Sequence, residues 1–258
     1  MIALAVRAGG LVQDHFNGAV SVSRKADHSP VTAADRDAEL LIMAGLAALA
    51  PWIPVIAEEA ASAGLLPAVG ACFFLVDPLD GTREFIAGGT DFTVNIGLIE
   101  DGAPSLGVVY APARAALYWG DVAAGTAWRA EQSPYADAGV ATRIAVRKPG
   151  AILCAVASKS HSTAATEAWL AAAGVGQRVS IGSSLKFVLV ASGEADVYPR
   201  PAPTMEWDTA AGDAILRAAG GRVLDLDNHP LAYGKPRFAN PGFIATGPYQ
   251  PAPLRPLN

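Results

Sequence analysis

Cys72-Phe73-Phe74-Leu75-Val76-Asp77-Pro78-Leu79-Asp80-Gly81-Thr82-Arg83-Glu84-Phe85 is the stretch of this sequence that decides the fold. Its first five residues are apolar and predict a buried strand, and the segment from Thr82 to Ile86 predicts the start of a helix. Pro78 fixes one backbone angle between the two aspartates, and Gly81 allows close backbone approach. Carboxylate and carbonyl oxygens are the ligands that Mg²⁺ prefers, and the N–H groups of a helix start attract an anion. The stretch therefore favours a metal and phosphate site over the alternative, a plain strand–turn–helix connection in which Asp80 only caps the helix.

The composition is that of a folded protein without a general affinity for nucleic acid. The chain has 258 residues, of which 52% are apolar and 17% charged, with a net charge of -5. This length is enough for one large domain or two smaller ones. The negative charge argues against a nucleic-acid polymer as partner but not against a small anionic substrate, because bound metal ions reverse the local sign.

The cellular location is predicted from the cysteines and the N-terminus. Cys72 and Cys154 each lie in an apolar, strand-like run and are expected to be buried free thiols. Met1 to Val12 is too short and too interrupted for a membrane span or a signal peptide and is expected to be part of an opening helix. We therefore expect a cytoplasmic protein, with loose association with the inner face of the membrane left open.

Two halves of different character are predicted. The first, residues 1–145, has a helix that ends near Ala50, and short strands from 92 to 129 whose spacing predicts an antiparallel meander. The second, residues 146–258, alternates strands with helices, which is typical of α/β proteins. We expect the first domain to carry the metal and phosphate site, and the second to contribute Asp208 and the substrate contacts.

Several acidic residues are placed where they can converge. Glu58 and Glu59 end the predicted strand 53–57, Asp77 and Asp80 follow the next, and Asp208 begins a predicted helix. Carboxylates that lie close together cannot all stay ionised without cations, so a metal is the natural counter-charge. No cysteine or histidine cluster has zinc spacing, which favours Mg²⁺ or Mn²⁺. The alternative for Asp208 is a simple helix N-cap.

Other candidate residues keep two interpretations. Thr32 and Asp35 have the spacing of a capping box, so Asp35 is either a structural cap or a functional carboxylate. His161 and Lys186 are either substrate contacts or ordinary surface and capping residues. Ser183 and Ser184 lie near a predicted helix start that could bind an anion.

Two segments resemble the signatures of the inositol monophosphatase superfamily of metal-dependent, lithium-sensitive phosphatases: Asp77-Pro78-Leu79-Asp80-Gly81-Thr82 and Trp207-Asp208-Thr209-Ala210-Ala211-Gly212. More narrowly, the chain is similar to bacterial 3'(2'),5'-bisphosphate nucleotidases of the CysQ type. The other segments that carry this resemblance are residues 25–35, Gly182 to Phe187, Tyr198-Pro199-Arg200 and Asn240 to Phe243. It covers nearly the whole chain and implies a layered αβαβα sandwich of the inositol monophosphatase and fructose-1,6-bisphosphatase type, an α+β and α/β combination with the site between the two domains.

The resemblance also implies a role for each site residue. The metal ligands would be Glu58, Asp77, the Leu79 carbonyl, Asp80 and Asp208, holding two or three Mg²⁺ ions for which Mn²⁺ can substitute. Asp35 and Thr82 would orient and deprotonate the attacking water, and the backbone N–H groups of Gly81 and Thr82 would hold the phosphate. The nucleotide would be contacted by Ser158, His161, Ser183 and Lys186.

The chain departs from the family pattern at a few positions. Arg83 stands where a lysine is common, Asp213 where a histidine is common, and Gly88-Gly89-Thr90 where the family has a bulkier, more charged stretch. Inositol phosphatases of this superfamily carry an acidic residue seven positions before the second-domain aspartate, a position that is Pro201 in this chain. Proline cannot accept a hydrogen bond from a polyol hydroxyl with its side chain.

The substrate implied is adenosine 3',5'-bisphosphate, which is released when activated sulfate is reduced, and the products would be AMP and phosphate. One rival is an inositol or fructose-bisphosphate phosphatase on the same fold, because fold does not fix substrate. A rival of another class is a catalytically silent regulator that binds metal or nucleotide. The sequence leaves open whether the protein is a monomer or a homodimer.

Overall fold

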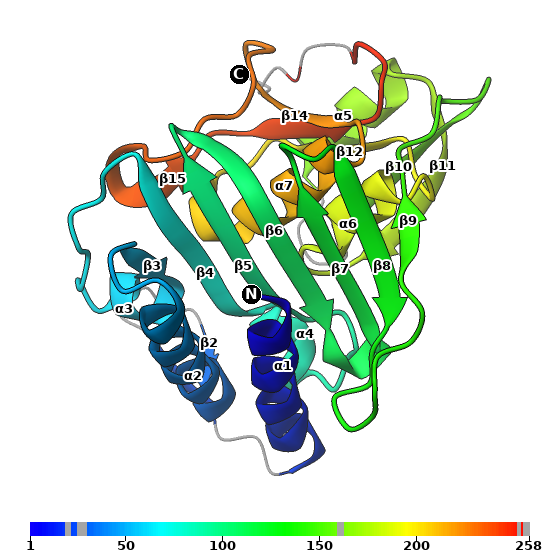
Figure 1. Ribbon diagram of the computed structural model, residues 1–258. Coiled ribbons are helices and arrows are strands. Elements are labelled where there is room, and N and C mark those ends of the chain that lie inside the picture. The colour runs from blue at the N-terminus through cyan, green and yellow to red at the C-terminus, as the bar shows by residue number, and fades with distance from the viewer. Residues whose placement is uncertain (19–21, 25–29, 159–162, 252–253, 255–258) are drawn as a thin grey trace.

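The computed structural model describes residues 1–18, 22–24, 30–158, 163–251 and 254. Its helices and sheets alternate in five layers (Figure 1). Helices α1 (Ile2–Asn17) and α2 (Ala33–Leu49) cover the outer face of a seven-stranded sheet. Helices α6 (Leu185–Ala191) and α7 (Ala210–Ala218) lie between that sheet and a five-stranded one, whose outer face is covered by α5 (Ala164–Ala172). This is the αβαβα sandwich that the sequence predicts.

The seven-stranded sheet is the meander expected for the first half of the chain. Its strands lie in chain order, and β3 is parallel to β4 while every other neighbouring pair is antiparallel. The strands are β3 (Val55–Ala57), β4 (Cys72–Asp80), β5 (Thr93–Glu100), β6 (Ala103–Ala111), β7 (Ala116–Asp121), β8 (Thr126–Glu131) and β9 (Thr142–Ile144). β9 was not predicted, because its three residues carry no apolar alternation.

The five-stranded sheet is mixed, with the order β11-β10-β12-β16-β14. β10 is parallel to β11 and β12, whereas β16 runs antiparallel to both of its neighbours. Its strands are β10 (Leu153–Ser158), β11 (Val175–Ile181), β12 (Val197–Arg200), β14 (Arg222–Asp225) and β16 (Phe243–Thr246). Two small ribbons pair β1 (Val22–Arg24) with β2 (Pro30–Thr32) and β13 (Thr204–Met205) with β15 (Ala239–Asn240). The first sheet ends at Ile144 and the second begins at Leu153, but the division into two domains stays a prediction.

Helix α7 packs directly onto the backbone of the seven-stranded sheet. Gly97, Gly107 and Gly120 are neighbours across β5, β6 and β7. A Cβ atom on Gly107 would lie 2.3 Å from the Ala211 carbonyl oxygen, and one on Gly120 would lie 2.7 Å from Ile215 Cα. Contacts this short do not occur between real atoms, so α7 has its present position only because these side chains are missing. Since α7 follows Asp208 closely, this row of glycines also positions Asp208.

The local structure differs from the predictions at three points. Strand β4 continues past Val76 and includes Asp77 and Asp80, because pairing with β5 resumes at Asp80 after an irregularity. Glu58 does not end a strand but begins the short helix α3 (Glu58–Ser62). The N-cap interpretation of Asp208 was wrong: Asp208 ends the 3₁₀ helix η2 (Glu206–Asp208), and Thr209 caps α7. The prediction of helix α4 (Thr82–Ile86) is confirmed, and Cys72 and Cys154 are free thiols, although Cys72 is only half-buried.

Candidate metal and phosphate site

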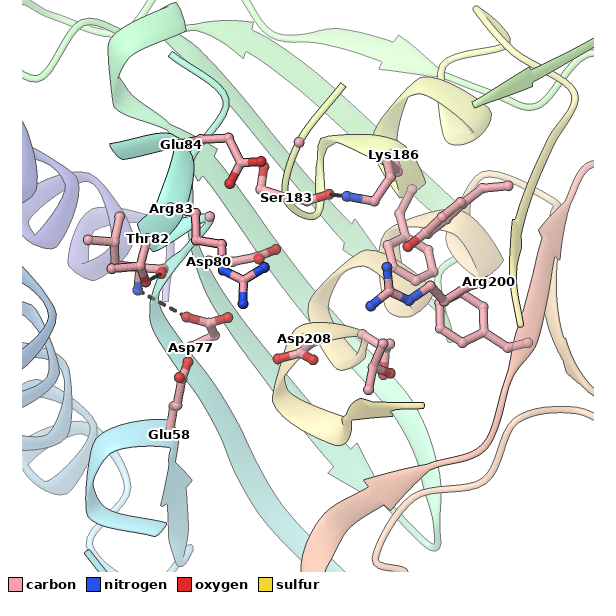
Figure 2. Close-up of a pocket in the computed structure, with 18 of the residues that line it drawn as sticks. Glu58, Asp77, Asp80, Thr82, Arg83, Glu84, Ser183, Lys186, Arg200 and Asp208 are labelled. Atoms are coloured by element: carbon pink, nitrogen blue, oxygen red, sulfur yellow. Dashed lines mark hydrogen bonds between the residues drawn. The ribbon is translucent and has the colours of Figure 1, made fainter. Parts of the chain in front are cut away.

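A cavity of about 330 Å³ lies where the carboxyl end of β4 meets the inner helices (Figure 2). Residues from both halves of the chain line it, and Figure 2 shows the Lys186 and Arg200 side chains on the side opposite Glu58 and Asp77, with Arg83 among the aspartates. The acidic side chains are Glu58, Asp77, Asp80, Glu84 and Asp208, and the basic ones are Arg83, Lys186 and Arg200. The arrangement suits a ligand that combines metal cations with an anionic group.

Three carboxylates from separate elements converge in this cavity. Glu58 at the start of α3, Asp77 in β4 and Asp208 in η2 each place one oxygen within 4.8 Å of the others. Glu59, which the sequence grouped with Glu58, lies outside this set, and its backbone N–H donates to the Glu39 carboxylate at 2.7 Å. Of the residues predicted to converge, the structure therefore brings Glu58, Asp77 and Asp208 together and places Asp80 in the same cavity outside this closest group, whereas Glu59 does not line the cavity.

Burial and mutual repulsion dominate the electrostatics of two of these carboxylates, Asp77 and Asp208. Burial raises the pKa of Asp77 well above its usual range, and Glu58, Asp80 and Asp208 raise it further. Burial and the neighbouring Asp80 and Glu58 raise the pKa of Asp208 to about 8. Like charges this close disfavour ionisation, and a bound cation removes the conflict.

Each aspartate has one oxygen held by the protein and one that is left for a ligand. Asp77 Oδ1 accepts from the Leu79 N–H at 3.0 Å, Asp80 Oδ2 from the Ser184 hydroxyl at 2.8 Å, and Asp208 Oδ2 from the Met205 N–H at 2.8 Å. Within the described part of the chain, no donor reaches the second oxygen of any of the three. An all-oxygen donor set of this kind fits a hard divalent cation such as Mg²⁺.

The turn after β4 requires glycine at position 81. Gly81 adopts a left-handed conformation with φ 92°, and a Cβ atom there would lie 2.7 Å from the Asp91 carbonyl oxygen. Only glycine satisfies both conditions. Gly81 and Thr82 line the cavity at the start of α4, and the single hydroxyl proton of Thr82 has two acceptors within 3.1 Å, the Leu79 carbonyl oxygen and Asp35 Oδ1.

Asp35 makes the predicted capping-box contact and also reaches Thr82 at the candidate site. Its Oδ2 accepts from the Thr32 backbone N–H at 2.8 Å and from the Thr32 hydroxyl at 2.6 Å, which is the capping-box contact. Its Oδ1 lies 3.1 Å from the Thr82 hydroxyl, which lines the cavity. One carboxylate therefore starts helix α2 and also contacts the candidate site.

Two of the three cations that line the cavity, Lys186 and Arg200, come from the second half of the chain and form its basic wall. Lys186 is 7% exposed, its ammonium donates to the Ser183 carbonyl, and it lies 5.5 Å from the centre of the Tyr198 ring. Burial lowers the pKa of Lys186, while the nearby Asp80 carboxylate raises it. Arg200 at the end of β12 also lines the cavity, a position that the predicted site set lacked although a cation directly after a predicted strand was visible in the sequence. These two cations face the carboxylates across the cavity (Figure 2).

Four other positions that the sequence singled out, two predicted substrate contacts and two departures from the family pattern, do not contribute a described side chain to the cavity. His161 lies outside the described residues, and of Ser158 only the backbone, at the end of β10, is described. Asp213 does not line the cavity but is buried behind it, where it binds Arg217 in a bidentate pair and accepts the Tyr233 hydroxyl at 3.0 Å. Pro201 is not among the described residues that line the cavity.

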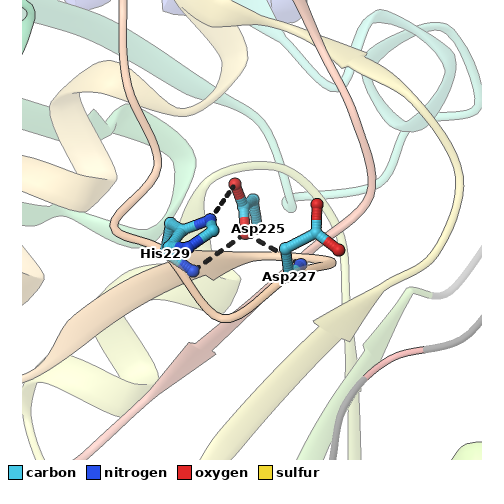
Figure 3. A group of neighbouring side chains, drawn as sticks. All are labelled: Asp225, Asp227 and His229. Atoms are coloured by element: carbon cyan, nitrogen blue, oxygen red, sulfur yellow. Dashed lines mark hydrogen bonds and ion pairs between the residues drawn. The ribbon is translucent and has the colours of Figure 1, made fainter.

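A second acidic group lies on the turn after β14 (Figure 3). Asp225 Oδ1 accepts the backbone N–H groups of Asp227 and His229, both at 2.9 Å. These bonds are those of an Asx turn, which accounts for the proximity of the three side chains without a ligand.

A layered sandwich that sets converging carboxylates against cations in one cavity defines a phosphatase that uses a divalent metal. The chain belongs to the inositol monophosphatase family, whose model matches residues 1–250.

Curated relatives and solved structures resemble the chain over nearly its whole length. A protein of Escherichia coli K12 named 3'(2'),5'-bisphosphate nucleotidase CysQ is 47% identical over 244 residues, which are 93% of this chain and 95% of that protein. The crystal structure of CysQ from Bacteroides thetaiotaomicron matches with a TM-score of 0.80 and 38% identity, covering 96% and 95% of the two chains. An inositol monophosphatase from Anabaena matches with a TM-score of 0.73 and 26% identity, covering 95% and 88%. Among the described residues, no helix is both long and apolar enough to cross a bilayer.

Proposed function

We propose that the protein hydrolyses the 3'-phosphate of adenosine 3',5'-bisphosphate to give AMP and phosphate. The observation that carries this proposal is the two-sided cavity, in which the carboxylates of Asp77 and Asp208 face the cations of Lys186 and Arg200. A substrate with two phosphates can place one at each side. The names of relatives that are 47–48% identical over most of the chain support the same substrate.

Glu58, Asp77, the Leu79 carbonyl, Asp80 and Asp208 would hold the metal, proposed to be two or three Mg²⁺ ions with Mn²⁺ as a substitute. When bound, the ions supply positive charge that stabilises the attacking and leaving oxygens of phosphoryl transfer. The three aspartate oxygens without a described donor support this assignment.

Asp35 and Thr82 would activate the water. When the Thr82 hydroxyl donates to Asp35 Oδ1, a lone pair of Thr82 Oγ1 faces the cavity and can accept a proton from water. Asp35, held in place by Thr32, then serves as the general base at the end of this relay. The N–H groups of Gly81 and Thr82 would hold the reacting phosphate at the start of α4.

Lys186 and Arg200 would bind the 5'-phosphate. Arginine suits a phosphate because its planar guanidinium donates two parallel hydrogen bonds, and the buried lysine adds a point charge. Ser183 would contribute to this end of the substrate, and Ser158 and His161 would contact the nucleoside. At the position of Pro201 the chain has no side-chain acceptor for an inositol hydroxyl, which disfavours the inositol phosphatase rival.

The biological setting follows from this reaction. We place the enzyme in the cytoplasm, where it would remove the nucleotide product of sulfate assimilation, and we expect inhibition by lithium because the family is sensitive to it.

A phosphate-release panel tests the proposal. The purified protein is assayed with Mg²⁺ on adenosine 3',5'-bisphosphate, inositol 1-phosphate and fructose 1,6-bisphosphate, with and without EDTA. We expect kcat/KM for the bisphosphate nucleotide to exceed that for inositol 1-phosphate by at least about tenfold, or roughly 1.4 kcal/mol. Equal or better hydrolysis of inositol 1-phosphate would refute the assignment as a nucleotidase and leave the assignment as a phosphatase intact. Release of no phosphate from any of the three would favour the silent regulator.

A further inference from the structure

A buried serine outside the predicted site set joins the two halves of the cavity. Ser184 is 2% exposed and caps α6, and its Oγ lies 2.8 Å from Asp80 Oδ2 and 3.0 Å from the Asp208 carbonyl oxygen. The side-chain amide of Asn95 in β5 donates to the same oxygen at 2.9 Å. Four elements, β4, β5, η2 and α6, therefore meet at one hydroxyl group.

The chemistry of this junction fixes which group donates to which. Ser184 has a single hydroxyl proton, and Asn95 already supplies a hydrogen bond to the lone pairs of Oγ. The proton must therefore point toward Asp80 or toward the Asp208 carbonyl, and a bond to a carboxylate is the stronger of the two. Asn95 also lies 3.5 Å from Asp80 Oδ2, too far to replace the hydroxyl as the main donor.

We infer that Ser184 is a positioning residue: its hydroxyl holds Asp80 Oδ2, leaves Asp80 Oδ1 turned to the cation, and ties this carboxylate to the backbone that carries Asp208. This inference rests on the proposed function, because it takes Asp80 and Asp208 to be metal ligands. It goes further, because it assigns the spacing between Asp80 and Asp208 to a residue that is not among the described residues lining the cavity.

The same turn links the metal ligands to the substrate side. Ser183, directly before Ser184, has a left-handed backbone with φ 50°, and its carbonyl accepts the Lys186 ammonium. The turn thus directs Ser184 toward Asp80 and the Ser183 carbonyl toward Lys186. Loss of the Ser184 hydroxyl removes only the first contact, so it should weaken metal binding and leave the substrate charge in place.

Mn²⁺ binding to the metal-free protein, followed by electron paramagnetic resonance without substrate, tests the inference. Removal of a group that orients a metal ligand typically costs about 10–100-fold in metal affinity, so we expect Ser184→Ala to weaken Mn²⁺ binding by about tenfold or more. Ser184→Thr keeps the hydroxyl and should retain most of the affinity. In the assay, Ser184→Ala should need more Mg²⁺ for half-maximal activity, with KM at saturating Mg²⁺ little changed.

Ser192→Ala is the matched control. Ser192 caps the other end of α6, and its hydroxyl also donates to a carboxylate, that of Glu194, at 2.8 Å outside the cavity. This variant should bind Mn²⁺ like the wild type, so any loss in Ser184→Ala cannot come from a missing serine hydroxyl on this helix in general.

The outcomes separate the inference from the function on which it rests. Wild-type Mn²⁺ affinity in a folded Ser184→Ala protein would overturn the inference. If that variant does not fold, Ser184→Cys replaces the hydroxyl with a weak thiol donor of similar size, and unchanged Mn²⁺ affinity there would also overturn it. If the wild type itself binds Mn²⁺ no better than Asp80→Asn, the metal site of the proposed function has failed, whatever Ser184 does.

Discussion

The two walls of the cavity are built in different ways. The acidic wall comes mostly from one stretch of chain, because β3 and β4 are parallel and bring Glu58, Asp77 and Asp80 to one sheet edge. The basic wall combines Lys186 from α6 with Arg200 from β12, which meet only when the second half folds. The comparison indicates that the two walls have different functions: the acidic wall would catalyse the reaction, and the basic wall would determine substrate specificity. Substitutions in the two walls should therefore have different effects on activity.

The largest effect is expected when the acidic wall loses a charge. Asp80→Asn and Asp208→Asn should each abolish most phosphate release at moderate Mg²⁺, because each removes an anionic ligand. Without metal, both variants should melt at a higher temperature than the wild type, since repulsion between the carboxylates is relieved. Phosphate release and thermal melting in EDTA measure the two effects.

Asp225→Asn, on the exposed turn after β14, is the control for this pair. It changes the same chemical group outside the cavity and should leave phosphate release unchanged. Near-wild-type turnover by Asp80→Asn or Asp208→Asn would contradict the metal assignment.

A smaller loss is expected when the metal ligands remain and the water relay is cut. Thr82→Ala should lower kcat on the order of 10²–10⁴-fold with little change in KM, because a positioned base acts mainly in the transition state. Asp35→Asn should behave similarly, and the double variant should be little worse than either single one. Because Asp35 also contacts Thr32, its variant should melt at a lower temperature as well. A loss of stability with an unchanged kcat would show that Asp35 acts only as a helix cap.

Changes in the basic wall should alter the choice of substrate more than the rate. Lys186→Ala and Arg200→Ala should each raise KM for adenosine 3',5'-bisphosphate by about tenfold, because each removes a charge from the second phosphate. Inositol 1-phosphate, which lacks that phosphate, should be hydrolysed as before. Steady-state kinetics on both substrates measure the split, and Lys148→Ala on the exposed surface is the control. A fall in kcat for both substrates would contradict this assignment and indicate that the two cations take part in catalysis.

The smallest effect is the pH dependence of the metal-free protein. Asp208, with its pKa raised from 3.8 to about 8, and Asp77 bind protons in the folded state that the unfolded chain has already lost. Stability in EDTA should therefore fall as pH rises from about 5 to 8. Melting curves should show this fall in the wild type and a weaker one in Asp208→Asn. A melting temperature that rises over this range in EDTA would show that the carboxylates do not repel one another as described.

The sequence predicted the acidic wall better than the basic one, and locality explains the difference. Asp77, Pro78, Gly81 and Thr82 lie within one turn, so their geometry follows from the local backbone. The position of Arg200 depends on how β12 is placed beside α6, and the contact between Ser184 and Asp80 joins residues 104 positions apart. No pattern along the chain encodes such distances.

Two other misses have different causes, a local capping contact and the register between two strands. Asp208 has the residue type of an N-cap, yet its side chain accepts from Met205 within η2, and Thr209 caps the helix instead. The meander was predicted, but the alignment of Gly107 with Gly120 becomes visible only when the register of β6 and β7 is known.

The row of glycines beneath α7 has a mechanical consequence. A helix that packs on side chains can shift when those side chains change rotamer. Helix α7 instead contacts the main chain of the sheet at Gly107 and Gly120, where no side chain can move to accommodate a shift. The sheet that carries Asp77 and the helix that follows Asp208 therefore behave as one stiff body. Helix α6, which carries Lys186, also packs closely on α7, because a Cβ atom on Gly212 would lie 2.6 Å from the Phe187 ring, so Lys186 is attached to that body too.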